Sequence, residues 1–196
     1  VTVENVPAYA DTALFKLITD ALDKNGYKWD TVIHDAADYG ANQTRKRVLL
    51  RAVRQGELPP LPPKEAGADW FKSIEDLIED APDSKIPNWE ITRIKNMVDR
   101  GTLDLNQPIL TMGGSVGRSV AAARNPGVPA PTLKASPKEV PRIRLPDGRV
   151  KRVTPAMMRR LMGLPDDYPT PEGHRLAKTI LGNGIHGEVT RKLIQP

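Results

Sequence analysis

The stretch Gln43-Thr44-Arg45-Lys46-Arg47-Val48-Leu49-Leu50 places two arginines directly before an apolar run. Arg45–Val53 has the composition of a β-strand, with its apolar centre at Val48-Leu49-Leu50. Side chains alternate between the two faces of a strand, so Arg45 and Arg47 should share one face while Lys46 points away. Two guanidinium groups on one face can hold a phosphate or a base carbonyl, although a salt-bridged surface strand would show the same pattern.

The residues before this strand predict one edge of an α/β sheet. Val1–Val3 has the composition of a short strand, and apolar residues recur at helical spacing over 10–24 until Asn25-Gly26 stops the helix. Tyr27–Ile33 predicts a second strand, followed by a loop over 34–42. This strand–helix–strand–strand order is typical of α/β folds.

Later segments predict a linker, a loop-rich module and closing helices. The proline-rich Gln55–Lys64 predicts a linker. Helices are expected over Ser73–Glu79, Trp89–Arg100, Ala156–Met162, Gly173–Leu181 and Glu188–Ile194, and the loop-rich module over Gly113–Val150. Thr154 suits the N-cap of the third of these helices, and Gly163 suits the position after its end.

Positive charge is concentrated in the second half of the chain. The net charge is −3 over residues 1–100 and +8 over 101–196, and 118–160 alone holds 11 basic and 2 acidic residues. Such a block is typical of a protein with a polyanionic partner, although a solvated basic surface would look the same. The chain has no cysteine, so it offers neither a thiol nucleophile nor a thiolate metal site. With no signal peptide or membrane-spanning run, we expect a soluble, intracellular protein without a membrane partner.

Glu4-Asn5-Val6 follows the first strand, at the sheet edge where α/β proteins bind ligands. Beside Val6 and Pro7, the Glu4 carboxyl could have a raised pKa and act as an acid, although it could equally cap the following helix. Further along, Gly182-Asn183-Gly184-Ile185 adds a glycine-rich turn whose backbone could approach a small polar ligand.

Together these clusters resemble the DNA (cytosine-5) methyltransferases. Glu4-Asn5-Val6 is similar to motif VI of that family, and Gln43-x-Arg45-x-Arg47, preceded by Asp38-Tyr39-Gly40, is similar to motif VIII. Arg152–Tyr168 resembles motif IX, with Pro129-Ala130-Pro131-Thr132 upstream of it, and Gly182-Asn183 resembles motif X. The motifs occur in the order of the family and extend over nearly the whole chain.

The resemblance implies transfer of a methyl group from S-adenosylmethionine, without a metal, to carbon 5 of a cytosine flipped out of duplex DNA. It implies catalytic roles for Glu4 on ring nitrogen 3, Arg47 on the carbonyl oxygen, and Asn5 in the same pocket. Asn183, Gly184 and Ile185 are expected to bind the cofactor. DNA contacts are expected from Gln43, Arg45, Arg118, Arg124 and Lys134, with Gln43 also bracing its loop.

The resemblance also implies an organisation. The fold should be the C-terminal part of a Rossmann-like methyltransferase sheet, over 1–54, with a linker and short helix over 55–83. A small target recognition domain is expected over 84–143, and closing helices over 144–196. We further expect a cytoplasmic protein encoded by a prokaryote or a phage, and the resemblance implies DNA methylation of the kind found in restriction-modification systems.

Two family features lie outside this sequence, namely the glycine-rich cofactor loop and the Pro-Cys-Gln loop. We therefore expect an N-terminal part or subunit to supply them, and we expect this chain to be inactive alone. Motif IX has Ala156 and Met157 where arginine and glutamate are usual, which removes the capping-box carboxylate, and Met162 where glutamine is usual. The alternatives are a non-catalytic DNA-binding specificity subunit, a relic of such an enzyme, or a related RNA methyltransferase.

Overall fold

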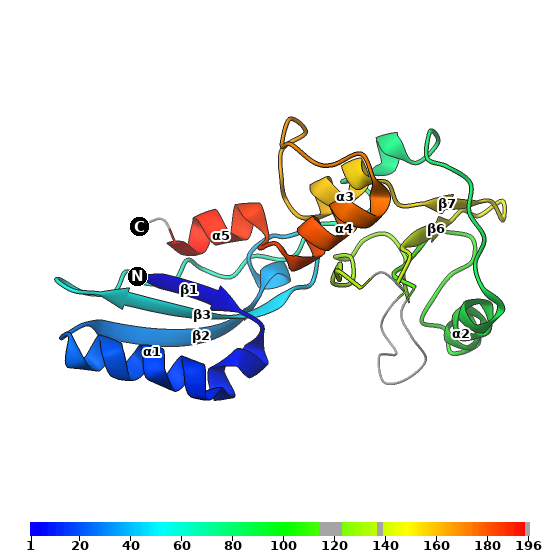
Figure 1. Cartoon of the computed structure of the whole chain (residues 1–196). Helices are drawn as coiled ribbons and strands as arrows, with labels where there is room; N and C mark the ends of the chain where they lie inside the picture. Colours follow the sequence, from blue (N-terminus) through cyan, green and yellow to red (C-terminus); the bar gives the residue numbers. More distant parts are fainter. Residues whose placement is uncertain (114–122, 137–138, 195–196) are drawn as a thin grey trace.

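The computed structural model describes residues 1–113, 123–136 and 139–194. Its elements gather in two lobes, with α4 (His174–Asn183) between them, and the N-terminus and helix α5 (Gly187–Ile194) lie at the same lobe (Figure 1). This first lobe contains β1 (Thr2–Asn5), α1 (Ala13–Lys24), β2 (Lys28–Asp35), β3 (Lys46–Val53) and the short 3-10 helices η1 (Pro7–Asp11) and η2 (Ala36–Asp38). The predicted order of strand, helix, strand and strand is confirmed.

The first lobe is a three-stranded antiparallel sheet in the order β1-β3-β2. Helix α1 covers one face, where Phe15 and Leu22 pack with Leu50 and Ala52 of β3. On the other face Leu49 packs with Val189 and Leu193 of α5 (Gly187–Ile194). β3 is therefore covered on both sides, which explains why its centre is a continuous apolar run without alternation.

The predicted loop over 34–42 is partly wrong. β2 continues to Asp35 and leads directly into η2. The Asp35 carboxylate accepts hydrogen bonds from the Ala37 and Arg45 backbone N–H groups, at 3.2 and 2.7 Å. This side chain therefore closes the connection between β2 and β3.

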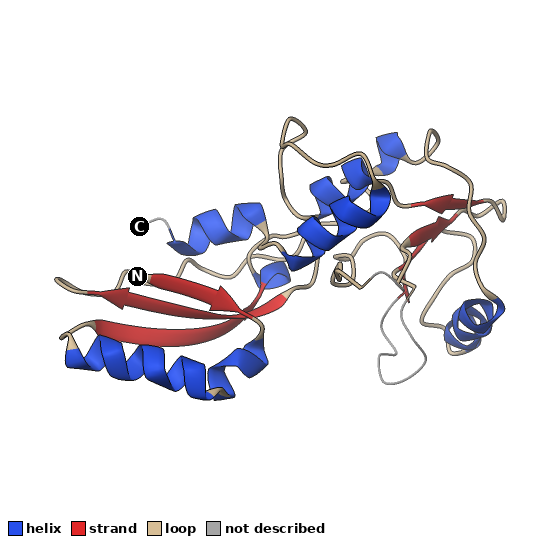
Figure 2. Ribbon diagram, in the orientation of Figure 1, coloured by secondary structure: helices blue, strands red, loops and turns tan. Residues whose placement is uncertain are grey.

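The second lobe is built on a four-stranded antiparallel sheet in the order β5-β4-β6-β7. Its strands β6 and β7 are seen side by side in Figure 2. Its elements are α2 (Asn88–Asp99), β4 (Ile109–Thr111), β5 (Ala123–Arg124), β6 (Arg142–Arg144) and β7 (Val150–Arg152). The expected boundary at residue 143 falls within β6, so this sheet extends the folded unit to Arg152.

The segment between the lobes is part of the core. Trp70, Ile74 and Ile78 are buried with Leu110 and Ile143 of the sheet. The helix predicted over Ser73–Glu79 is wrong. Successive backbone hydrogen bonds there join residues three apart, and the only regular element is the 3-10 helix η3 (Glu75–Leu77).

The closing helices are confirmed as α3 (Pro155–Leu161), α4 (His174–Asn183) and α5. The Thr154 hydroxyl caps α3 by accepting from the Met157 N–H at 3.3 Å. The Met157 sulfur in turn accepts from the Thr154 N–H at 3.4 Å, so a thioether occupies the place of the usual carboxylate. Among the described residues, no helix is long and apolar enough to cross a membrane.

Candidate active site

Glu4 and Arg47 form an ion pair at the carboxyl end of β1. Glu4 lies opposite Leu49 in the β1–β3 register, and Arg47 is two residues from Leu49, so both side chains belong to the same face of the sheet. The Arg47 Nε lies 3.0 Å from the Glu4 Oε1. The structure thus brings together the two residues that the sequence predicted as the acid and the oxygen clamp.

Burial pushes both members of this pair toward their neutral forms. It raises the pKa of the Glu4 carboxyl, although the charges of Arg47 and Arg45 act in the opposite direction. It also lowers the pKa of the Arg47 guanidinium, against the effect of Glu4. The attraction within the pair therefore does not fully offset lost hydration. A carboxyl of this kind can hold and donate a proton nearer neutral pH than an exposed glutamate can.

His34 is a third member of this row that the sequence did not single out. It pairs with Arg47 in the β2–β3 register, so Glu4, Arg47 and His34 come from three adjacent strands. The side chain is buried, its Nδ1 has no hydrogen-bond partner among the described residues, and its ring lies edge-on to Tyr39. Burial is the main cause that lowers the pKa of His34, and Arg47 adds to it. The sequence signal that could have identified His34 is its position two residues after Val32. This spacing continues the alternation of the predicted strand beyond Ile33.

Asn5 is not brought into this row. It pairs with Val48, one position along from the Glu4–Leu49 pair, and alternation therefore assigns it to the other side of the sheet. Its Oδ1 accepts a hydrogen bond from the Val6 N–H at 2.8 Å. In this structure Asn5 shapes the turn that leaves β1.

Gln43 is completely buried and braces three segments. Its Nε2 donates to the Leu161 carbonyl at 2.9 Å, and its Oε1 accepts from the Leu133 N–H at 3.1 Å. Beside it, Thr44 N–H donates to the Ala130 carbonyl at 2.8 Å. Gln43 therefore joins the start of β3 to α3 and to the segment around Leu133. It forms no part of a DNA-facing surface here.

Arg45 is also buried, and among the described residues its guanidinium donates only to backbone carbonyls. Nη1 donates to Leu133 and Nη2 to Gly182, each at 3.1 Å, and Nη2 also donates to Gly184. Burial lowers its pKa to about 10, with Arg47 as the second cause. Arg45 thus ties the strand that carries Arg47 to the turn at the end of α4, and like Gln43 it lies in the interior.

Asn183 at the end of α4 and Ile185 in the turn after it, both expected cofactor contacts, are exposed. Between them, the Gly184 carbonyl accepts a hydrogen bond from Arg45. The next residue, His186, is 4% exposed, and neither ring nitrogen has a partner among the described residues. Burial, aided by the charge of Arg45, lowers its pKa to about 4. His186 is therefore neutral at physiological pH and packs as an apolar ring.

Part of the basic block is paired with acids from earlier in the chain. Ion pairs join Arg142 to Glu90, Arg149 to Glu79, Lys151 to Asp83 and Arg160 to Asp76. Of the three residues expected to contact DNA from this block, Arg118 lies outside the described residues. Lys134 is exposed and lies 3.4 Å from Glu139. Arg124, on β5, has no carboxylate within ion-pair distance in the described part of the chain.

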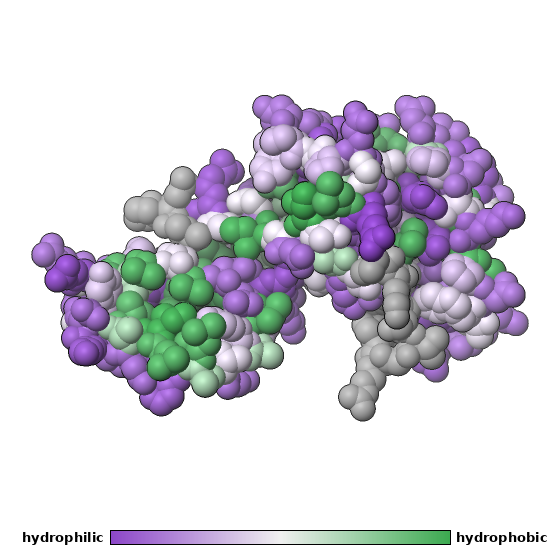
Figure 3. Space-filling view, viewed as in Figure 1, coloured by the Kyte–Doolittle hydropathy of each residue, from purple (hydrophilic) through white to green (hydrophobic). Residues whose placement is uncertain are grey.

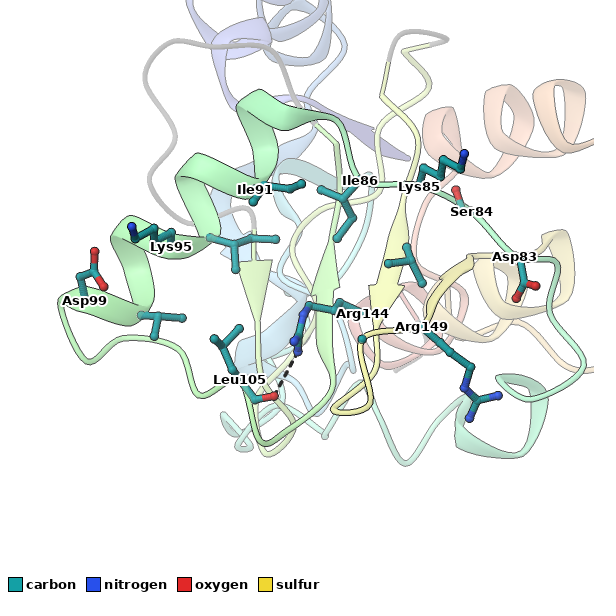
Figure 4. Close-up of a pocket in the computed structure, with 14 residues that line it drawn as sticks. Asp83, Ser84, Lys85, Ile86, Ile91, Lys95, Asp99, Leu105, Arg144 and Arg149 are labelled. Atoms are coloured by element: carbon teal, nitrogen blue, oxygen red, sulfur yellow. Dashed lines mark hydrogen bonds between the residues drawn. The ribbon is translucent and has the colours of Figure 1, made fainter.

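A separate cavity of about 920 Å³ lies in the second lobe between α2 and the β6–β7 hairpin. Ile86 and Ile91 point toward one another across it, and Arg144 donates to the Leu105 carbonyl at 3.1 Å (Figure 4). Its lining contains none of the residues of the Glu4–Arg47 row. This cavity is thus not the place where the expected catalytic groups meet.

Comparison with known proteins points to one family. The family model for C-5 cytosine-specific DNA methylases matches residues 1–196. The fold is similar to that of the Entamoeba histolytica methyltransferase EhMeth, at 15% identity and a TM-score of 0.61, over 94% of this chain and 57% of that one. No curated protein sequence matched.

Two further solved structures have the same fold. A mutant of Spodoptera frugiperda DNMT2 matches at 10% identity and a TM-score of 0.56, over 98% of this chain and 63% of that one. The S. pombe Dnmt2 methyltransferase matches at 12% identity and a TM-score of 0.56, over 98% and 64%. This chain therefore spans less than two thirds of the length of each of these proteins.

Proposed function

This chain belongs to the C-5 cytosine-specific DNA methylase family, and from this premise we propose that it supplies the acid and recognition side of a DNA methyltransferase. The complete enzyme would transfer a methyl group from S-adenosylmethionine to carbon 5 of cytosine in duplex DNA. The observation that carries the proposal is the Glu4–Arg47 ion pair, 3.0 Å apart at the carboxyl end of β1.

The chemistry of cytosine explains why this pair is suitable. Carbon 5 is a poor nucleophile until a thiolate adds at carbon 6 and an acid neutralises the ring. The half-buried Glu4 carboxyl, with its raised pKa, can donate to ring nitrogen 3. Arg47 can donate to the adjacent carbonyl oxygen, so the two side chains would hold one edge of the base. Both groups reach a base only when it leaves the stack, which favours base flipping.

The turn 183–185 fits one edge of the cofactor. The exposed Asn183 offers an amide donor and acceptor, and the exposed Ile185 offers an apolar surface, which suit the polar and ring parts of S-adenosylmethionine. When bound, the cofactor supplies an activated methyl group. Arg45 would hold this turn in place through the carbonyls of Gly182 and Gly184, while Gln43 fixes the loop that precedes Arg45.

The thiol would come from another polypeptide segment, because this chain contains no cysteine. We define this thiol-bearing segment as the polypeptide, encoded next to this chain or preceding it in the same frame, that contains the Pro-Cys-Gln loop. The second lobe, with Arg124 and Lys134, would contact the DNA, and Gln43 and Arg45 would act as braces behind that surface.

The test is Glu4→Gln in the enzyme reconstituted with the thiol-bearing segment. Methyl transfer from labelled S-adenosylmethionine to a DNA duplex should fall by roughly 100-fold or more, which is the usual effect of removing a general acid. Duplex binding should be retained. The matched control is Glu57→Gln, because Glu57 is an exposed glutamate of the same lobe that pairs with Lys28. Residues 1–196 alone should transfer no label.

Three outcomes would contradict the proposal. Transfer by residues 1–196 alone would show that no external thiol is needed. Unchanged turnover of the Glu4→Gln enzyme would instead favour a DNA-binding specificity subunit, since such a module has no use for the acid. Methylation of tRNA in preference to duplex DNA would favour the related RNA enzyme.

A further inference from the structure

The cavity between α2 and the β6–β7 hairpin has no part in the proposed function. Its volume of about 920 Å³ is of the size of small-molecule binding sites, which is roughly 300 to 1,000 Å³. Much of its wall is aliphatic, formed by Ile86, Ile91, Ile94, Val98, Leu105 and Val150. On the face seen in Figure 3 the second lobe is largely hydrophilic, with a small hydrophobic area between the hairpin and α2.

Helix α2 presents apolar side chains to this cavity as well as to the core. Ile94 and Met97 are buried with Ile109 of β4. Ile91, on the cavity side of the helix, is 51% exposed, and Leu105 is 39% exposed. A surface helix normally turns polar residues outward beyond its single apolar stripe. An apolar group that enters the cavity would remove these side chains from water, which is favourable.

Arg144 of β6 places a guanidinium among these aliphatic side chains (Figure 4). The residue is partly buried, and its Nη1 donates to the Leu105 carbonyl at 3.1 Å. Within the described part of the chain this is the one hydrogen bond of its side chain, and no carboxylate lies within ion-pair distance. Arg149, in contrast, points away from α2 and is paired with Glu79 and Asp147. Arg144 therefore retains donors for an acceptor that enters the cavity.

The other charged residues of the lining also favour an anion. Lys85 and Lys95 have no carboxylate within ion-pair distance among the described residues. Of the two aspartates in the lining, Asp83 is paired with a lysine of β7, whereas Asp99 is not paired in the described chain. Together with Arg144, the unpaired cations therefore outnumber the unpaired acids, and this excess attracts a negatively charged ligand.

We propose that this cavity binds a small organic anion that has an aliphatic or aromatic body and one carboxylate. The body would pack between Ile86, Ile91 and Leu105, and the carboxylate would accept hydrogen bonds from the Arg144 guanidinium. The aliphatic wall strengthens that ion pair, because charges attract each other more strongly away from water. DNA does not suit this wall, since protein–DNA interfaces are predominantly polar. Binding here would not depend on methyl transfer, because the lining contains none of the Glu4–Arg47 row.

Octanoate is a suitable probe, and octan-1-ol is its uncharged counterpart. In calorimetry at neutral pH with purified residues 1–196, octanoate should bind saturably at one site, and octan-1-ol roughly tenfold more weakly or less tightly still. Arg144→Met should weaken octanoate binding by roughly tenfold or more and leave the affinity for octan-1-ol unchanged, because only the carboxylate uses the guanidinium. On addition of octanoate, the backbone amide resonances that shift should be those of α2 and the β6–β7 hairpin.

The matched control for the arginine is Arg152→Met, because Arg152 is an exposed arginine of the neighbouring strand β7 and does not line the cavity. It should leave both affinities unchanged. Ile91→Glu should weaken the binding of both ligands, whereas Leu176→Glu, which changes an exposed leucine of α4, should weaken neither. If Arg144→Met fails to fold by circular dichroism, the preference for octanoate over octan-1-ol and the effect of Ile91→Glu decide the matter.

Equal affinity for octanoate and octan-1-ol, or no binding of octanoate, would overturn the proposed site. So would octanoate binding that Ile91→Glu leaves unchanged, because the ligand would then lie elsewhere on the chain. A dimer of the chain that Ile91→Glu dissociates would show that a second copy occupies the cavity. Competitive displacement of octanoate by a DNA duplex would instead assign this wall to the DNA-binding surface, and either result would overturn the small-molecule site.

Discussion

At the scale of single residues, the buried polar side chains fix the segments around the site. Gln43 and Arg45 form hydrogen bonds with backbone carbonyls and one N–H group of distant segments. His186, in contrast, is buried, and neither of its ring nitrogens has a hydrogen-bond partner among the described residues. A buried imidazole can stay neutral without a partner, but its charged form has no compensating acceptor. His186 should therefore make stability depend on pH.

The folded pKa of His186 is about 4, below its ordinary value of 6.5. The unfolded chain then binds more protons between these values, so stability is fully present above about pH 6.5 and declines as the pH falls toward 4. We expect His186 to account for a loss of about 2 kcal/mol between pH 7 and pH 5. Urea unfolding at both pH values, for the unmodified chain and for His186→Gln, measures this as the change in their difference. If the two proteins differ in unfolding free energy by the same amount at both pH values, the prediction is contradicted. The contributions of His34 and His174 cancel in this comparison, because both proteins contain these residues.

At the scale of elements, the ends of α2 and α3 offer a comparison, because each is followed by a glycine with left-handed backbone. Gly163 after α3 has φ of 62°, and Gly101 after α2 has φ of 69°. Their surroundings differ, because a Cβ at Gly163 would lie 2.3 Å from the His186 Cε1, whereas one at Gly101 would meet nothing within 4 Å. The end of α3 is thus set by a contact as well as by conformation.

This difference predicts the cost of adding a methyl group. Gly101→Ala should cost about 1 kcal/mol of unfolding free energy, from the left-handed conformation alone. Gly163→Ala should cost about 2 kcal/mol more, because the buried ring of His186 must move. In a His186→Ala background the cost of Gly163→Ala should return to that of Gly101→Ala. Denaturant unfolding of the four variants measures these values, and equal costs for the two glycines in the unmodified background would refute the contact.

At the scale of the whole molecule, a short segment before β3 holds the lobes in place. Arg45 reaches carbonyls 88, 137 and 139 residues away along the chain, at Leu133, Gly182 and Gly184. Gln43 adds contacts to Leu161 and Leu133. The buried guanidinium of Arg45 therefore connects the strand that carries the Glu4–Arg47 pair to the turn where the cofactor is expected.

Arg45→Met should weaken this junction. Three carbonyls would lose a charged donor, and we expect a loss of about 3 to 4 kcal/mol of unfolding free energy. Hydrogen exchange should accelerate in the backbone amides of α4 and α5 more than in those of α2, which lies far from the junction. Arg54→Met is the matched control, because Arg54 is exposed at the end of the same strand region, and it should change stability by less than about 0.5 kcal/mol. Uniform acceleration over all helices would argue against a local junction.

The sequence by itself determined the strands and helices of the first lobe and the closing helices. These follow from periodicity and capping, which are local properties of the chain. Tertiary structure decided the rest. The interior position of Gln43 and Arg45, the row completed by His34, the 3-10 turns over 73–79 and the pairing of the basic block with earlier acids all depend on residues far along the chain. Burial and pairing of a polar group are set by what packs against it, and no local pattern contains that information.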